Sequence, residues 1–299
     1  MTDFIQGVVG DPTVYVNGDF VPLSKASISV LDRGFIFGDG IYEVVPIYHG
    51  QPFRMQEHLS RLERSLGKLE IAPPMDKAGW LDLVKQLVAL EPDRECGMVY
   101  IQVTRGVAKR DHAFPVPPVK PTVFAMLAPM TPPGPEPRTK GVSAVSIPDD
   151  RWLHCDIKSV SLLGNVLAKQ AAVKAGVDEV VQFRDDYLTE AASCNIWVVK
   201  NGAVYAPPKD NLVLEGIRYG LFEELCQESG IPFHLTPVSR AEVESADELM
   251  LSSATREILP IVKLDHQNVG NGEPGPIYKQ LRQAYDDRIA ALAPLGSAA

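Results

Sequence analysis

A dense run of prolines divides the 299-residue chain near its middle. Nine of the 25 prolines lie within residues 115–137, and segment 129–137 is the densest part. Proline fixes the backbone angle φ and has no amide donor, so a run of this kind resists helix formation and is typical of a stiff connector. The chain length suits one or two domains. We therefore predict a small N-terminal domain at 1–130, an interdomain linker at 131–138 and a larger C-terminal domain at 139–299.

Both halves mix strands with helices. Segments 13–16 and 20–23 flank Asn17-Gly18, a pair that favours a two-residue hairpin turn. Apolar residues then recur at helical spacing from Met55 to Leu69. The other predicted strands are 41–48, 98–104, 122–127, 142–147, 179–183, 195–199 and 248–251, and the other predicted helices are 76–91, 162–174, one ending at Gly230 and one beginning at Pro276. Because hairpin-linked strands are frequent, we predict an α+β fold and no simple βαβαβ dinucleotide domain.

Composition excludes several classes of partner. The chain carries 29 Lys and Arg against 38 Asp and Glu, a net charge of −9 without a basic stripe, which disfavours nucleic acid. No window of about 18 apolar residues and no basic, apolar leader is present, so we expect no membrane span and a cytoplasmic location. The four cysteines lack C-x-x-C spacing and are expected to be free thiols.

Common catalytic motifs are missing from the sequence. We find no phosphate-binding G-x-x-x-x-G-K-[ST], no H-E-x-x-H, no G-x-S-x-G and no G-x-G-x-x-G that opens a helix. The six histidines are scattered without i, i+4 pairing. These observations disfavour ATP hydrolysis, zinc proteolysis and serine hydrolysis, and we expect no metal site.

A few polar residues stand in apolar surroundings. Lys158 precedes an apolar helix, where desolvation would suit an imine-forming amine, but it is one of fourteen lysines and composition alone does not choose it. Glu190 follows a strand into a turn of small residues, and Arg110 with His112 follows another strand end. For Arg110 and His112 an anion site and an ordinary polar loop are equally compatible with the sequence. Glu190 is also compatible with an ordinary turn carboxylate, and for Lys158 and Arg61 these grounds favour solvated positions.

Taken together, the segments resemble the class IV pyridoxal 5′-phosphate (PLP) aminotransferases, and among them the D-amino acid aminotransferases. The resemblance covers about residues 14–285, nearly the whole chain. Its most specific stretches, in the order that the family has them, are 32–44, 57–62, 102–112, 151–159, Thr189-Glu190 and 251–255. It implies a two-domain fold type IV PLP enzyme, with a small N-terminal α/β domain and a larger C-terminal, PLP-binding domain that contains a pseudo-barrel of strands.

The resemblance gives roles to individual residues. Lys158 matches the lysine that holds PLP as an aldimine and carries the proton during amino transfer. Glu190 matches the carboxylate that faces the pyridine nitrogen and keeps it protonated. Arg61 matches the phosphate arginine, and Tyr42 matches a phenol beside the lysine.

The implied phosphate site departs from the family pattern. Backbone amides near Ile217, at the start of a helix, are expected to bind the phosphate. Arg218 and Ala254 stand where well-known members have threonines, so two hydroxyl donors are lost. Arg218 would replace them with a charge-assisted contact, with Ser253 and Thr255 as neighbouring donors.

Arg110 and His112 match the trap for the substrate α-carboxylate, which the family places in the active site of the neighbouring subunit. The resemblance therefore implies a homodimer with shared active sites. Branched-chain aminotransferases of the same fold lack this Arg-x-His arrangement, so the pair favours D substrates.

The resulting prediction is a D-amino acid aminotransferase that moves the amino group of D-alanine or related D-amino acids to 2-oxoglutarate, giving pyruvate and D-glutamate. The alternatives are a branched-chain L-amino acid or (R)-amine transaminase, or an aminodeoxychorismate lyase of the same fold. A non-catalytic binding protein is the most distant alternative, because a binder has no need of Lys158 and Glu190.

Overall fold

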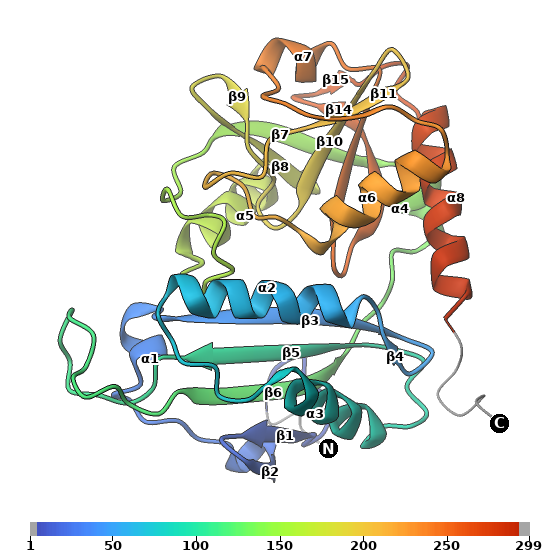
Figure 1. The fold of residues 1–299 in the computed structure, drawn as a ribbon. Helices are drawn as coiled ribbons and strands as arrows, with labels where there is room; N and C mark the ends of the chain where they lie inside the picture. Colours follow the sequence, from blue (N-terminus) through green and yellow to red (C-terminus); the bar gives the residue numbers. More distant parts are fainter. Residues whose placement is uncertain (1–4, 293–299) are drawn as a thin grey trace. The chain divides into compact units, whose positions relative to one another are not determined.

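The computed structural model describes residues 5–292, which form two compact units (Figure 1). Of these residues, the first unit comprises 5–130 and Ile157–Ser161, and the second comprises 131–156 and 162–292. The five residues Ile157–Ser161, which the sequence assigns to the C-terminal domain, group with the first unit because their backbone pairs with a strand there.

The first unit is an antiparallel sheet with two long helices. Its strand order is β2-β1-β6-β5-β3-β4. The strands are β1 (Thr13–Val16), β2 (Asp19–Pro22), β3 (Gly40–Tyr48), β4 (Gln51–Pro52), β5 (Cys96–Thr104) and β6 (Thr122–Pro129), and the helices are α1 (Arg33–Phe37), α2 (Met55–Lys68) and α3 (Lys77–Ala89), with a 3₁₀ turn at Leu23–Lys25. Helix α2 packs along β3 and α3 packs against β6 (Figure 1).

The core of this unit follows from sequence periodicity. Alternate residues of β5 are buried, as expected for a strand with one face on the core. Leu59, Leu62 and Leu66 of α2 and Trp80 of α3 are 1% exposed or less and face the same core. The helices predicted at 55–69 and 76–91 are thereby confirmed, and the second begins at a capping aspartate, Asp76, whose side chain accepts from the Gly79 N–H.

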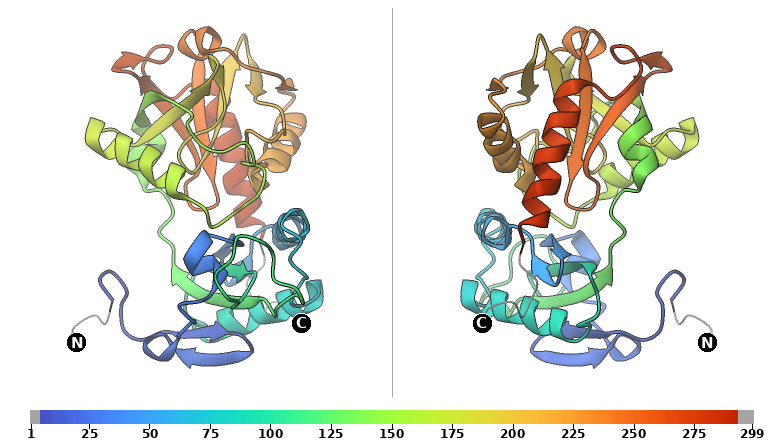
Figure 2. Two further views of the ribbon diagram at one scale, coloured as in Figure 1. Left: turned by 90° about the vertical axis from the view of Figure 1, so that its left-hand side faces the viewer. Right: turned by 90° about the vertical axis from the view of Figure 1, so that its right-hand side faces the viewer.

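The second unit contains a mixed sheet of nine strands. Eight of them have the order β12-β11-β10-β13-β14-β7-β8-β9, and the ninth, β15, pairs with β14. Three neighbouring pairs, β11–β12, β14–β7 and β7–β8, are parallel. Its strands are β7 (Val142–Pro148), β8 (Glu179–Arg184), β9 (Tyr187–Leu188), β10 (Asn195–Lys200), β11 (Ala203–Ala206), β12 (Phe233–Leu235), β13 (Glu248–Ser253), β14 (Glu257–Leu264) and β15 (Gln267–Asn268). The sheet is curled (Figure 2), in agreement with the predicted pseudo-barrel of strands.

Five helices complete the second unit: α4 (Pro135–Lys140), α5 (Leu163–Ala175), α6 (Ile217–Glu228), α7 (Arg240–Glu244) and α8 (Pro276–Ala290). Trp197 of β10 stacks on Phe222 of α6 with ring centroids 4.0 Å apart, which fixes this helix against the sheet. Among residues 5–292, no helix has the length and apolar composition needed to cross a membrane.

One sequence expectation is wrong at the proline run. The segment 131–138 was expected to resist helix, but helix α4 begins there at Pro135. The prolines of this helix lie in its first turn, where the amide has no intrahelical acceptor, so their missing N–H groups break no helical hydrogen bond.

Two glycines of the first unit should respond oppositely to an added methyl group. Gly67 lies in α2 with no atom within 4 Å of the position that a Cβ would take, so Gly67→Ala should stabilise the protein by about 0.5–1 kcal/mol. Gly106 has φ +104°, and a Cβ there would lie 2.1 Å from the Lys120 carbonyl oxygen, so Gly106→Ala should destabilise by about 1–3 kcal/mol. Urea denaturation measures both changes, and equal effects would contradict this assignment.

Candidate functional site

Lys158 is fixed by its own backbone on the first unit. Its carbonyl accepts from the Tyr42 N–H of β3 at 3.0 Å, and its N–H donates to the Ser65 Oγ of α2 at 3.2 Å. Val160 N–H donates to the Gly40 carbonyl at 3.0 Å, and Ile157 packs against the core of this unit. The Lys158 side chain is half-buried. The chain thus presents an amine from a short segment that is bonded to both a strand and a helix.

Tyr42 lies next to this amine, and Tyr100 of the neighbouring strand lies beside Tyr42. The Lys158 Nζ lies 4.1 Å from the centroid of the Tyr42 ring, close enough for a cation–π contact. The rings of Tyr42 and Tyr100 have centroids 5.8 Å apart. Burial, with a smaller contribution from Tyr42, raises the pKa of Tyr100 to about 12, and its hydroxyl donates to Gln102 at 2.7 Å. Tyr100 therefore stays neutral at physiological pH.

Arg61 is held by a buried carboxylate. Its Nε and Nη2 donate to the two oxygens of Glu43 at 2.7 and 2.8 Å, and His58 Nδ1 lies 2.7 Å from Glu43 Oε2. All three side chains are 6% exposed or less. Burial alone would raise the pKa of Glu43, but the charge and hydrogen bonds of Arg61, together with His58, hold that pKa well below its usual range. The bidentate pair fixes the direction of the guanidinium.

Arg110 and His112 lie on the exposed loop after β5. Both side chains contact the same ring: Arg110 lies 5.5 Å from the Phe37 centroid, and the rings of His112 and Phe37 have centroids 5.4 Å apart. The structure therefore brings these two predicted residues together as a pair of exposed basic groups.

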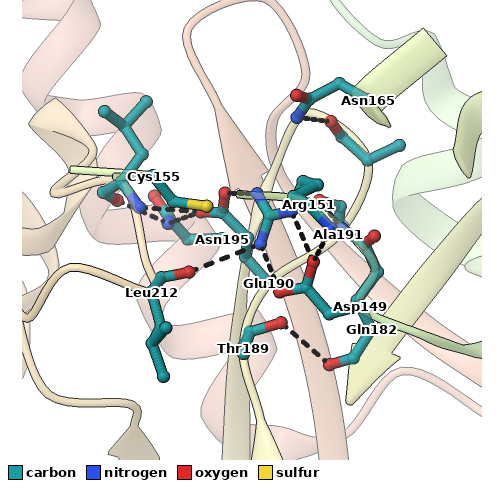
Figure 3. Close-up of polar contacts among 12 residues, drawn as sticks. Asp149, Arg151, Cys155, Asn165, Gln182, Thr189, Glu190, Ala191, Asn195 and Leu212 are labelled. Atoms are coloured by element: carbon teal, nitrogen blue, oxygen red, sulfur yellow. Dashed lines mark hydrogen bonds and ion pairs between the residues drawn. The ribbon is translucent and has the colours of Figure 1, made fainter. Parts of the chain in front are cut away.

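Glu190 lies at the centre of a buried polar cluster in the second unit (Figure 3). One carboxylate oxygen accepts from Arg151, and the other accepts from Asn195 Nδ2 at 3.3 Å and from the Leu214 N–H at 3.1 Å. Burial raises the pKa of Glu190, and Arg151 opposes this effect. Without Arg151, this carboxylate would lose the charge that favours its ionised form.

A second carboxylate holds Arg151 in place. Asp149 accepts from Arg151 Nε at 2.9 Å and from its Nη2 at 2.8 Å, and it also pairs with Arg184 at 3.3 Å. Burial would raise the pKa of Asp149, but the hydrogen bonds and charge of Arg151 outweigh it and lower the pKa to about 2. The side chains of Asp149, Arg151 and Glu190 form one continuous chain of ion pairs, as Figure 3 shows.

Helix α6 begins at Ile217, and its capping residue Gly216 has no side chain to hydrogen-bond to the first amides. A Cβ at Gly216 would lie 2.1 Å from the Asn195 side-chain oxygen, so only glycine fits beside Asn195. Arg218 is buried, and its Nη2 donates to the Tyr285 hydroxyl at 2.7 Å and to the Ala254 carbonyl at 3.3 Å. The helix therefore opens at a glycine cap, followed by the backbone amide of Ile217 and a buried cation one residue later.

The remaining predicted residues, Ser253, Ala254 and Thr255, are half-buried at the turn between β13 and β14. Ser253 Oγ accepts from the Arg256 N–H at 3.1 Å. The Ala254 carbonyl and Arg218 connect this turn to the start of α6. Within the second unit, the predicted phosphate residues Ile217, Arg218 and Ala254 therefore lie together.

Four residues that hold the predicted ones in place were not predicted from the sequence: Glu43, Asp149, Arg151 and Asn195. Glu43 had a readable signal, because it is a carboxylate at an inward position of a strand whose other inward residues are apolar. Among residues 5–292, no group of three or more His, Cys, Asp or Glu side chains is arranged to hold a metal ion.

Comparison with known proteins places this chain among aminotransferase sequences and folds. The sequence model of the family described as "Amino-transferase class IV" matches residues 40–264. The D-alanine aminotransferase of Staphylococcus haemolyticus is 38% identical over 276 residues, which are 92% of this chain and 97% of that protein. The D-alanine aminotransferase of Staphylococcus epidermidis is 41% identical with the same coverage.

Solved structures share the fold. The branched-chain amino acid aminotransferase of Escherichia coli matches with a TM-score of 0.87 and 23% identity, covering 93% of this chain and 94% of that one. The branched-chain aminotransferase of the archaeon Thermoproteus uzoniensis, solved with norvaline, matches with a TM-score of 0.85 and 23% identity, covering 94% of this chain and 95% of that one. A further branched-chain amino acid aminotransferase, solved with pyridoxamine 5′-phosphate, matches with a TM-score of 0.86 and 24% identity, covering 96% of each chain.

The Glu43–Arg61 pair predicts acid sensitivity. Because the folded-state pKa of Glu43 lies below its unfolded value, its contribution to stability is present above about pH 4.5 and is lost as the pH falls. Glu43→Gln should lower the free energy of unfolding at pH 7 by about 3 kcal/mol, and this difference from the wild type should shrink toward pH 3. Urea denaturation across this range measures it.

Glu63→Gln provides the control, since Glu63 lies on the same helix as Arg61 with a side chain 42% exposed. Its unfolding free energy should stay within about 0.5 kcal/mol of the wild type. A Glu43→Gln penalty that is constant with pH would contradict the assigned ionised pair.

Proposed function

Because the chain belongs to the amino-transferase class IV family, we propose that it is a PLP-dependent D-amino acid aminotransferase. It transfers the amino group of D-alanine or related D-amino acids to 2-oxoglutarate, giving pyruvate and D-glutamate. The observation that carries this proposal is the pair of Arg110 and His112 on one aromatic ring, in a chain 38–41% identical to proteins named D-alanine aminotransferase.

The donor set of the chain suits PLP. The cofactor needs an amine for its aldehyde, a carboxylate for its ring nitrogen and an anion site for its phosphate. Lys158 offers the amine, Glu190 offers a buried carboxylate, and Arg61 offers a fixed guanidinium. The start of α6 offers a helix N-terminus whose capping residue is a glycine, and Gly216 lies close to Asn195 of the Glu190 cluster.

The phosphate set that we propose is Arg61 with the amides of Ile217 and Arg218 and the turn Ser253–Thr255. The Arg218 side chain donates to Ala254 and Tyr285, so the contribution that we propose for it is its positive charge beside the turn. This arrangement compensates for the absence of a hydroxyl at Ala254.

When bound, PLP acts as an electron sink that makes the substrate Cα hydrogen acidic. Lys158 would take this hydrogen as a proton and return a proton on the product side, as a general base and acid. Tyr42, whose ring lies 4.1 Å from Nζ, would hold the amine in position. Arg151 would keep Glu190 ionised, so that Glu190 can hold a proton on the facing ring nitrogen.

Arg110 and His112 would bind the substrate α-carboxylate and so decide which face of Cα is turned to the base. We propose that they serve the active site of a second copy, in a homodimer with shared sites. Apolar side chains on one face of α5 support such an interface, because they are more than half exposed in the single chain. They are Leu163, Val166, Leu167 and Val173.

We also propose a cytoplasmic location, which is supported by the four cysteines, all free thiols in the structure. The substrates that we propose are small amino and 2-oxo acids of that compartment.

A panel of amino donors tests the proposed function. D-alanine, L-leucine and an amine without a carboxylate are each supplied with 2-oxoglutarate, and the keto product is quantified. We expect turnover with D-alanine alone. Preference for L-leucine would place the chain among the branched-chain aminotransferases, and preference for the amine would place it among the amine transaminases. Release of pyruvate from aminodeoxychorismate without an acceptor would place it among the lyases.

Replacement of the amine should stop the reaction. Lys158→Ala should lower kcat by at least about 10³-fold while the urea midpoint changes little, because the side chain is half-buried. Lys85→Ala, at an exposed position of α3, is the matched control and should retain wild-type turnover. A folded and active Lys158→Ala variant would refute the catalytic assignment.

Removal of the Arg110 side chain, the proposed partner of the substrate carboxylate, should weaken substrate binding and leave the cofactor bound. Arg110→Ala should raise KM for D-alanine by about 10- to 100-fold, the effect of losing a charge-assisted hydrogen bond, with PLP affinity unchanged. Lys109→Ala removes the neighbouring exposed cation and should leave KM near the wild-type value. Equal losses of D-alanine and PLP binding would show that the carboxylate is bound elsewhere.

A further inference from the structure

The segment 32–40, with its Asp-Arg-Gly and Gly-Asp-Gly ends, has no role in the proposed chemistry so far. In the structure its charged residues form a buried junction. The Asp39 carboxylate accepts from Arg33 Nε at 2.7 Å, from Arg105 Nε at 2.8 Å and from Arg105 Nη2 at 3.0 Å. The three side chains are 10% exposed or less. One carboxylate thus fixes two guanidinium groups.

The remaining donors of Arg33 are turned to the backbone of the loop after β5. Its Nη1 donates to the carbonyls of Asp111 at 2.6 Å and Ala113 at 3.2 Å, and its Nη2 donates to the carbonyl of His112 at 3.4 Å. Three consecutive carbonyls therefore share one guanidinium. The residues that carry them include His112 itself and the residue directly after Arg110.

Arg105 holds the other side of the same junction. Its Nη2 donates to the Leu69 carbonyl at 2.7 Å, at the carboxyl end of α2, and its guanidinium lies 3.5 Å from the centroid of the Phe114 ring. Both contacts stabilise the Arg105 cation, because the carboxyl end of a helix and the face of an aromatic ring each attract positive charge. The loop is therefore anchored at Phe114 as well as at 111–113.

Helix α1 supplies a third contact. Phe37, at its end, lies under both Arg110 and His112, with Arg110 5.5 Å from the ring centroid. Arg33 and Phe37 are separated by four residues, so they lie on the same face of this helical turn. One short element thus contacts the backbone of the loop and the exposed side chains of Arg110 and His112.

We infer that Arg33 and Asp39 are positioning residues for the substrate-carboxylate site: they fix the backbone at 111–113 and so hold Arg110 and His112 in their binding positions. This inference rests on the proposed role of Arg110 and His112. An exposed loop without such bonds would have to be ordered each time substrate binds, which weakens binding. The guanidinium fork is needed, because a lysine has one small charged head and cannot reach a carboxylate and three carbonyls at once.

Arg33→Lys tests the inference, since it keeps a positive charge beside Asp39 and removes the fork. We expect KM for D-alanine to rise about tenfold, with kcat within about threefold of the wild type. Amide hydrogen exchange should accelerate at 108–114 and stay unchanged in β3 and β5. Phe37→Leu, at a half-buried position, is a second variant that leaves the ion pairs intact and should raise KM in the same direction.

A double-mutant cycle separates positioning from general damage. If Arg33 acts through Arg110 and His112, Arg33→Lys should change KM little once Arg110→Ala and His112→Ala are both present, and its effect should not add to theirs. Arg282→Lys is the matched control, because Arg282 is also a buried arginine that donates to Glu257 and to the Ile258 carbonyl, in the second unit. It should lower the unfolding midpoint without changing KM or exchange at 108–114.

Three results would overturn the inference: a folded Arg33→Lys variant with wild-type KM, an increase in KM that persists when Arg110 and His112 are both alanine, or unchanged exchange at 108–114. If the wild-type protein does not use D-alanine, the proposed function is wrong. Exchange in Arg33→Lys then decides the structural part of the inference by itself, since acceleration at 108–114 requires no substrate.

Discussion

The pairing of five residues, Ile157–Ser161, with strand β3 is the constraint on which the arrangement of the first unit's site depends. Hydrogen bonds at Lys158 and Val160 attach this segment to the strand, and Ser65 attaches it to α2. Because β3 is also paired along its whole length with β5, the backbone of Lys158 is held as firmly as a sheet residue. A half-buried amine is thereby kept beside Tyr42 without being locked inside the core.

Buried ion pairs set the direction of the charged groups in each unit. Glu43 holds Arg61, Asp149 holds Arg151 beside Glu190, and Asp39 holds Arg33 and Arg105. Taking such charges out of water is unfavourable, and replacing them by apolar residues is often neutral or stabilising. Their value to this chain is a fixed orientation, which the proposed anion and proton sites of amino transfer would require.

Sequence periodicity predicted most of the fold but not the partners of the site. Regular elements such as α2 and β5 were predicted because their apolar residues recur with a fixed period. Strand β14 was not predicted. Pro260 lies inside it, and a proline within a strand argues against a central position. In the structure the pairing of β14 with β7 is irregular just after this proline. The resemblance assigned roles to Lys158 and Glu190 but none to Glu43 or Arg151, since side-chain contacts between residues that are distant in sequence leave no local pattern.

The visible absorption spectrum of the purified protein with PLP tests the central claim most directly, when recorded before and after adding D-alanine or L-leucine. A lysine-bound cofactor with D-specific amino transfer predicts a yellow protein whose colour D-alanine removes and L-leucine leaves. Bleaching by L-leucine alone would contradict the assigned handedness, and a protein that stays colourless with PLP would contradict the cofactor site.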